Sequence, residues 1–148
     1  MIKIHYKTVE PDPRLDGGNK FKLRKSETLF VRTISSNVLK MGNSSSGIHK
    51  LLELDMKVKF PEYLQLYLIP SEVLVKKYKA TPTLYMQEVT GVPDKYTDNL
   101  KFGIVALSGS TLPKNLVAAR LVVKLSPDAS IWNKIKWFFS RDITYIYD

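Results

Sequence analysis

Apolar and polar residues alternate along much of the chain, and this period of two is the pattern of β-strands that bury one face. The clearest run covers residues 52–60, where every second residue is apolar and most of the others are charged. The chain also begins this way, because Ile2, Ile4 and Tyr6 alternate with basic residues. We therefore expect several half-buried strands.

Two longer strands are expected at residues 100–107 and 116–125, separated by a turn of Gly, Ser and Pro. Shorter strand-like segments are expected at residues 21–23, 28–34, 63–69 and 81–89. Residues 73–78 fit either a helical turn or an extended link. Roughly eight to ten short strands at this spacing predict an all-β sandwich, jelly roll or barrel.

The end of the chain follows a different pattern. Ser126 is a good helix cap with Pro127 in the first turn, and Ile131, Ile135 and Phe138 would share one face of the following helix. A terminal strand is expected at 143–147. We therefore divide the chain into a β domain, residues 1–125, and a helix–strand tail, residues 126–148.

The tail is rich in aromatic and basic residues and allows two interpretations. Its helix packs on its own domain or on a neighbouring subunit, or it docks on a partner or a membrane interface. In either case the expected contact residues are Trp132, Lys134, Lys136, Trp137, Phe138, Phe139 and Arg141.

Composition narrows the class of protein. The 148 residues suffice for one domain with a real core, and no run reaches the ~18 apolar residues of a membrane span. The charged, alternating start is not a secretory signal, and cysteine is absent, so we expect an intracellular protein without disulfides. The net charge of +9 fits either a generally basic, solvated surface or an anionic partner, namely nucleic acid, anionic membrane or acidic protein.

Candidate chemistry is sparse. His5 and His49 lack ligand spacing, so we expect no metal site and no cofactor. Glu53 and Asp55 would share the polar face of a strand, where solvation is the expected role. Asp94 lies two residues before Tyr96 on a loop, which suits contact with a sugar or base, but also suits a turn Asp and a half-buried Tyr.

Four blocks of the sequence carry a family resemblance: residues 50–63, KLLELDMKVKFPEY; 69–78, IPSEVLVKKY; 91–99, GVPDKYTDN; and 117–122, VAARLV. In this order they resemble blocks of the trimeric dUTPases, a family of small all-β nucleotide hydrolases. The first resembles the family's strand leading to its Pro-Glu-Gly-Tyr turn, with the Gly lost, and the second falls where the family has Pro-Arg-Ser-Gly-Leu-Ala. The third resembles the family's sugar-binding block, and the fourth resembles Arg-Ile-Ala-Gln-Leu-Val. The resemblance implies a jelly-roll-like barrel and a homotrimer. It also implies that Asp94 and Tyr96 are vestiges of a nucleotide site.

The departures from the family concern the groups that handle anions. Lys22 stands where the family has a carboxylate that helps hold magnesium, and a cation there would repel the metal. Glu72 stands in the phosphate-binding block, and a carboxylate there would oppose a triphosphate. The family's Gly-rich arm is replaced by the aromatic tail. Hydrolysis of a nucleoside triphosphate needs this positioned charge, so the activity is expected to be lost.

The resulting expectation is a non-catalytic interaction or structural protein on a dUTPase-like scaffold, with no catalytic residues. A viral protein, in a host cell or a virion, is the guess that the resemblance supports. A residual nucleotide binder or hydrolase and a basic nucleic-acid-binding module remain the alternatives. The partner, the source organism and the use of the basic charge are left open by the sequence.

Overall fold

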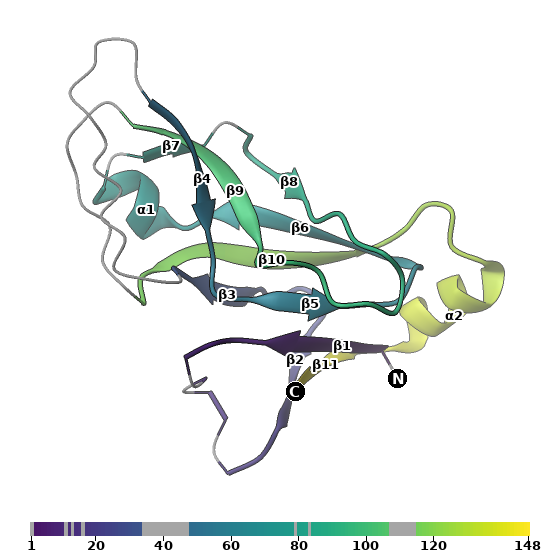
Figure 1. Cartoon of the computed structure of the whole chain (residues 1–148). Coiled ribbons are helices and arrows are strands. Elements are labelled where there is room, and N and C mark those ends of the chain that lie inside the picture. Colours follow the sequence, from purple (N-terminus) through teal and green to yellow (C-terminus); the bar gives the residue numbers. More distant parts are fainter. Residues whose placement is uncertain are drawn as a thin grey trace.

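The computed structural model describes residues 2–10, 12, 14–15, 17–33, 48–78, 80–82, 84–106 and 115–148. Within this part of the chain the protein is mostly β, as the alternating pattern predicts (Figure 1). The described strands form three open sheets, so a closed jelly-roll barrel stays a prediction.

The first sheet joins the two ends of the chain. Its strand order is β2 (Lys20–Arg24), β11 (Asp142–Tyr147), β1 (Ile2–Lys7) and β5 (Lys57–Lys59). Strands β1 and β11 are parallel, whereas the β2–β11 and β1–β5 pairs are antiparallel. The predicted tail, residues 126–148, thus supplies an interior strand of this sheet.

The second and third sheets cover the remaining strands. The second has the order β3 (Leu29–Arg32), β10 (Val117–Leu125), β6 (Leu64–Pro70) and β8 (Gln87–Glu88). The third has the order β4 (Ile48–Glu53), β9 (Lys101–Ala106) and β7 (Ala80–Pro82). The two long strands predicted at 100–107 and 116–125 are therefore β9 and β10, apart from Leu107 and the turn after it, which lie outside the described residues.

The single run predicted at 52–60 is divided in the structure. Strand β4 ends at Glu53, Leu54 forms a bridge to Thr33, and β5 begins at Lys57. The chain changes sheets between β4 and β5, and the alternation of buried and exposed residues is interrupted there, because Leu54, Asp55 and Met56 are all buried. Strand β5 then lies along β1, where Val58 is opposite Tyr6.

One core lies between the inner faces of the sheets. The first sheet buries Ile2, Ile4 and Tyr6 from β1, with Ile143 and Tyr145 from β11. The registers explain this, because Ile2 is opposite Ile143 and Ile4 is opposite Tyr145, so these side chains point to the same side. The other sheets add residues such as Leu66, Leu121 and Ile104.

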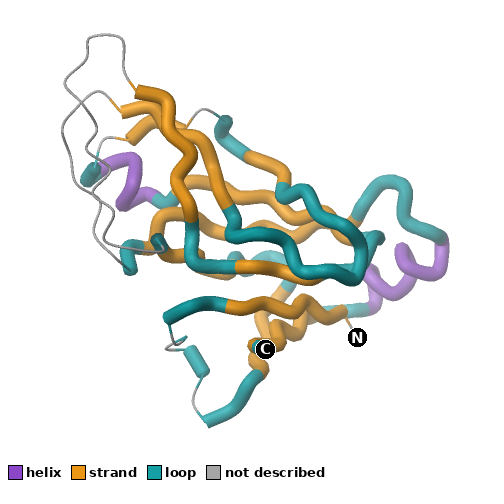
Figure 2. Tube along the Cα trace, viewed as in Figure 1, coloured by secondary structure: helices purple, strands orange, loops and turns teal. Residues whose placement is uncertain are grey.

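The two helices of the described residues lie at opposite ends of the molecule (Figure 2). Helix α1 (Glu72–Lys76) confirms the helical alternative for residues 73–78, and the side chain of Ser71 caps it by accepting from the Leu74 amide. Helix α2 (Ile131–Phe139) leads into β11.

The predicted start of α2 is wrong by one turn. Ser130 is the N-cap and accepts from the Asn133 amide at 3.3 Å. Ser126 instead closes a preceding turn, in which its side chain accepts from the Asp128 amide. Both serines suit a cap, so local sequence did not distinguish them.

We predict that Ile143→Ala lowers the free energy of unfolding by about 3 kcal/mol, measured by urea denaturation, because the Ile143 side chain is 1% exposed in the core. Ile146→Ala is the matched control, since Ile146 lies on the same strand but points to the opposite, half-exposed face. A larger loss for Ile146→Ala would contradict the register of β11.

Candidate binding surfaces

The loop that carries Asp94 and Tyr96 lies along the free edge of β5. The Thr97 amide donates to the Val58 carbonyl at 2.9 Å, and the Val58 amide donates to the Thr97 hydroxyl at 3.2 Å. Asp94 is exposed and adopts a positive φ of 61°, which supports its interpretation as a turn residue.

Tyr96 is engaged by residues of the first sheet. Its hydroxyl donates to the carboxylate of Asp148, which also lies 3.1 Å from Nδ1 of His5. Its half-exposed ring has the ammonium groups of Lys7 and Lys59 at 4.2 and 5.0 Å from the centroid. Tyr96 therefore belongs to a basic environment, while its hydroxyl is already bonded.

The other positions identified by the resemblance lie elsewhere in the chain. Lys22 is opposite Thr144 in the first sheet, and Glu72 lies in the first turn of α1, with Lys76 at 3.8 Å. The Asp94 loop is near the start of β6, because Val92 and Pro93 line one hollow with Leu64. Glu72 follows the other end of β6, roughly 20 Å along the strand. One copy of the chain does not gather these positions into one site.

Helix α2 carries an exposed apolar surface, which we call the aromatic surface. Five large side chains are between 43% and 87% exposed there: Ile131, Trp132, Ile135, Phe138 and Phe139. At 3.6 residues per turn they occupy one continuous arc of about 120°. Helix α2 itself has no buried residue, so its apolar side is not packed on the protein.

The opposite side of α2 holds it against the body. Trp137 packs at the edge of the core, its carbonyl accepts from Nζ of Lys25 at 2.6 Å, and that ammonium lies 4.9 Å from its ring centroid. Lys136 lies 5.5 Å from the ring centroid of Tyr63. The helix is thus attached by its more polar side, which is the reverse of a helix that covers a core.

Cations border the aromatic surface. Arg24, Lys25 and Arg141 line a hollow of about 430 Å³ together with Phe138 and Phe139. Lys134 is exposed on the helix itself, and α2 contains no Asp or Glu.

The outer face of the first sheet is strongly basic, and we call it the basic face. Residues that pair directly across strands point to the same side, so the registers define its members. The eleven positions are Lys20, Lys22 and Arg24 on β2, Asp142, Thr144 and Ile146 on β11, Lys3, His5 and Lys7 on β1, and Lys57 and Lys59 on β5. Six lysines and one arginine therefore share this face with one carboxylate.

Two of these cations lie directly opposite one another. Lys7 is the partner of Lys57 in the antiparallel β1–β5 pair. Like charges directly opposite each other in a sheet destabilise it. Folding alone therefore does not account for them.

The basic face adjoins both sides of α2 at one end of the sheet. Arg24 of the basic face lines one hollow with Phe138 and Phe139 of the aromatic surface. A second hollow, of about 420 Å³, is lined by Lys3 and His5 of β1, Lys59 of β5 and Lys136 on the body-facing side of α2, with Asp94 on its wall. Asp94 therefore faces the basic residues across an open hollow rather than a closed nucleotide pocket.

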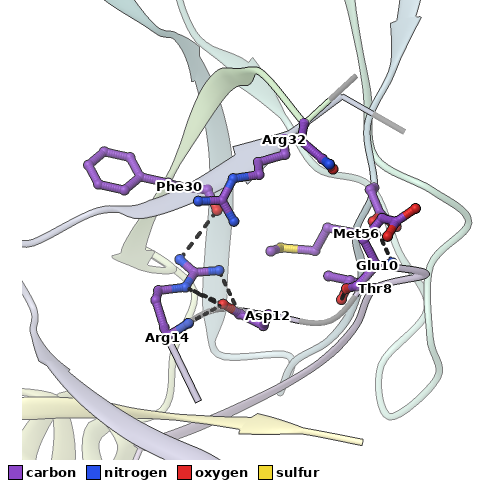
Figure 3. Close-up of a pocket in the computed structure, with 9 residues that line it drawn as sticks. Thr8, Glu10, Asp12, Arg14, Phe30, Arg32 and Met56 are labelled. Carbon is purple, nitrogen blue, oxygen red and sulfur yellow. Dashed lines mark hydrogen bonds and ion pairs between the residues drawn. The ribbon is translucent and has the colours of Figure 1, made fainter. Parts of the chain in front are cut away.

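A further hollow, of about 370 Å³, lies at the other end of β1 (Figure 3). Its charges are largely paired within it. Asp12 accepts from Nε and Nη2 of Arg14 at 2.9 and 2.7 Å and from the buried Tyr6 hydroxyl at 2.6 Å. Arg14 also donates to the Phe30 carbonyl at 3.4 Å, so this network holds the segment after β1 against β3.

Asp55 lines the same hollow. We expected both Glu53 and Asp55 to be solvated, and for Asp55 this expectation was wrong. Its carboxylate is buried and accepts from the amides of Val9 and Glu10 at 2.7 and 3.0 Å. Glu53 is exposed and accepts from the Asn99 amide group. The change of sheet after β4 turns Asp55 inward, where it ties down the backbone after β1.

Burial by itself would raise the pKa of Asp12, but the hydrogen bonds from Arg14 and Tyr6 outweigh it and hold that pKa below its usual value. Burial, followed by the bond to Asp12, raises the pKa of Tyr6. Asp12 therefore stays ionised and Tyr6 stays protonated near neutral pH.

Within the described residues, no group of three or more His, Asp or Glu side chains could hold a metal ion, and no helix is long and apolar enough to cross a membrane. No protein-family model matches the chain, and no curated protein matches it significantly.

Sequence reasoning found the aromatic residues of α2 but did not find the basic face. The lysines are dispersed along the sequence, and they meet only through the pairing of β1, β2 and β5. The signal was present in the segments IKIHYK, KFKLR and KVK, which each alternate basic and apolar residues.

We predict that Asp12→Asn lowers the free energy of unfolding by about 2 kcal/mol at pH 7, because Arg14 and Tyr6 lose their charged partner. A folded-state pKa below the ordinary value gives stability that is present above pH ~4 and is lost as pH falls further. Urea denaturation between pH 7 and 3 should therefore show a weaker acid dependence in the variant. The exposed Asp128→Asn is the control, and equal losses in both variants would contradict the role of Asp12.

Proposed function

We propose that this chain is a non-catalytic docking protein, in which the β-sheet body presents α2 to an anionic membrane surface. The observation that carries the proposal is the aromatic surface, where five large apolar side chains are exposed on one helix. Burying such side chains is favourable, so a surface of this kind indicates an interaction site.

The residues around the aromatic surface favour a bilayer as the occupant. Aromatic side chains bordered by Lys and Arg are typical of helices that lie in the headgroup region of anionic membranes. Each Lys or Arg near such a surface contributes about 1 kcal/mol of attraction. Lys134 and Arg141 are positioned for this.

A second copy of the chain fits the same surface less well. Two aromatic surfaces brought together would place Arg24, Lys25 and Arg141 of one copy near the same cations of the other. The subunit contact considered for the tail is therefore an alternative outcome of the test.

The proposed scaffold is the jelly roll of the trimeric dUTPases, with its hydrolytic chemistry lost. Its support remains the order of the four blocks, together with Lys22 and Glu72 at positions where the family carries groups of opposite charge. A viral accessory or structural protein is the setting that we propose from this resemblance.

Assembly as a homotrimer belongs to the same proposal. Within the described strands, β2, β8, β4 and β7 each have one edge without a strand partner, and a symmetric oligomer is a common way to cover such edges.

We predict that Phe138→Ser/Phe139→Ser lowers affinity at least about tenfold for vesicles that contain roughly 30% phosphatidylserine in phosphatidylcholine, measured by co-sedimentation. In Trp137→Phe, where Trp132 is the remaining tryptophan, emission should shift to the blue on binding. Leu84→Ser/Tyr85→Ser removes two exposed apolar residues elsewhere and serves as the control.

Equal binding by the α2 variant and the control variant would contradict the membrane proposal. So would a wild-type protein that ignores these vesicles, or an oligomer that dissociates in the α2 variant, because the surface would then be a subunit contact.

We further predict, by light scattering, a mass about three times the 16.9 kDa of one chain, and no magnesium-dependent release of pyrophosphate from dUTP in the same sample. A monomeric mass would contradict the trimer. Pyrophosphate release that Asp94→Ala abolishes would favour the residual-hydrolase alternative instead.

A further inference from the structure

We propose that the basic face of the first sheet binds single-stranded nucleic acid through its phosphate groups. This proposal goes beyond membrane docking by α2, because it concerns different residues and a second partner. Its basis is the convergence of Lys3, Lys7, Lys57, Lys59 and the β2 cations on one side of four paired strands.

The geometry of the face suits a linear polyanion. Side chains two residues apart on a strand are spaced by about 6.7 Å, and neighbouring strands by about 4.8 Å. Lys20, Lys22 and Arg24 therefore form one row along β2, while the cations of β1 and β5 form two adjacent rows. Rows of cations at this spacing can contact successive phosphates of one strand.

Acidic residues do little to neutralise the face. Asp142 is the one carboxylate among its eleven positions, and it lies opposite Arg24. Asp148, beside the face, is engaged by His5 and Tyr96. None of its lysines forms an ion pair with a carboxylate within the described part of the chain.

Tyr96 provides an aromatic ring among these cations. The ring is half-exposed between Lys7 and Lys59, so a base could stack on it while the two ammonium groups hold the flanking phosphates. A basic surface combined with an aromatic platform is the usual way to bind single strands without strong sequence preference.

Two features favour nucleic acid over a bilayer on this face. The large exposed apolar side chains of the described residues lie outside it, so the face has nothing to insert between lipids. The directly opposed pair Lys7–Lys57 weakens the folded sheet, and a bound polyanion would relieve that repulsion.

The test uses a fluorescein-labelled thymidine oligonucleotide of about 20 nucleotides and measures its anisotropy at several salt concentrations. For the wild-type protein the logarithm of the affinity should fall with the logarithm of salt concentration with a slope of about −3 to −5. An affinity independent of salt would overturn the proposal.

Lys7→Gln/Lys57→Gln separates binding from folding. Affinity should fall about tenfold at low salt and the slope should become less steep by about 1.4, because two phosphate contacts are lost. The melting temperature should stay constant or rise, because the two opposed charges are gone. Lys76→Gln/Lys101→Gln removes the same charge from α1 and β9 and is the matched control; an equal loss of affinity there would overturn the proposal.

Tyr96 and the edge strand supply independent variants. Tyr96→Ala should lower affinity about tenfold, whereas Tyr96→Phe, which keeps the ring, should bind like the wild type. Lys20→Gln/Lys22→Gln on β2 should weaken binding without touching the core. Retained affinity in both Tyr96→Ala and the β2 variant would overturn the proposal.

Cross-tests distinguish this proposal from the proposed function. Phe138→Ser/Phe139→Ser should keep its oligonucleotide affinity, and Lys7→Gln/Lys57→Gln should keep its vesicle affinity within about threefold. Polyglutamate that binds wild-type protein as tightly as the oligonucleotide would show an acidic-protein surface and overturn the proposal. The proposal would also be overturned if Lys7→Gln/Lys57→Gln lost its affinity for vesicles but kept its affinity for the oligonucleotide.

Discussion

The pairing of β1 with its two neighbours, β11 and β5, is the constraint on which the rest of the structure depends. Each pair in the first sheet has a fixed register, so a shift by one residue would exchange the two faces of a strand. In the observed register Ile2, Ile4 and Tyr6 enter the core and Lys3, His5 and Lys7 face outward. Core formation and the gathering of cations are therefore consequences of the same pairing.

The same constraint positions α2. Because β11 lies between β1 and β2, the helix that precedes it is held at the end of the first sheet, beside Lys3 and Arg24 (Figure 1). Trp137 and Lys25 then attach one side of the helix to the body, which leaves the apolar side exposed. The two proposed binding surfaces adjoin for this reason, although their chemistry differs.

Local pattern predicted much of the strand content but not the partners. The alternation at 2–7 identified β1, since half-buried strands need a period of two, and the apolar runs bounded by Gly or Pro at 63–69 and 116–125 identified β6 and β10. Sheet order depends on contacts between distant residues, so the parallel pairing of β1 with β11 and the basic face could not be read from one segment. The expectation that Asp55 is solvated was wrong for the same reason, because the chain changes sheets after β4 and the Asp55 side chain is buried there.

In the tail, the sequence pattern predicted the helix correctly but did not predict which side of the helix packs on the body. The spacing of Ile131, Ile135 and Phe138 correctly indicated a helix with one apolar face, yet an apolar face normally packs inward. Which side packs inward also depends on the contacts that the residues on the opposite side of the helix make with the body. Here Trp137 and Lys136 make the contacts with the body, at Lys25 and Tyr63.

The register of β1 against β11 can be measured directly, because the chain has no cysteine of its own. His5→Cys/Ile146→Cys places two thiols on neighbouring strands at paired, half-exposed positions of the basic face. Mild oxidation should close this disulfide readily and leave His5→Cys/Tyr147→Cys, whose side chains point to opposite faces, largely reduced. Cross-linking of the second pair in preference to the first would contradict the register and, with it, the basic face.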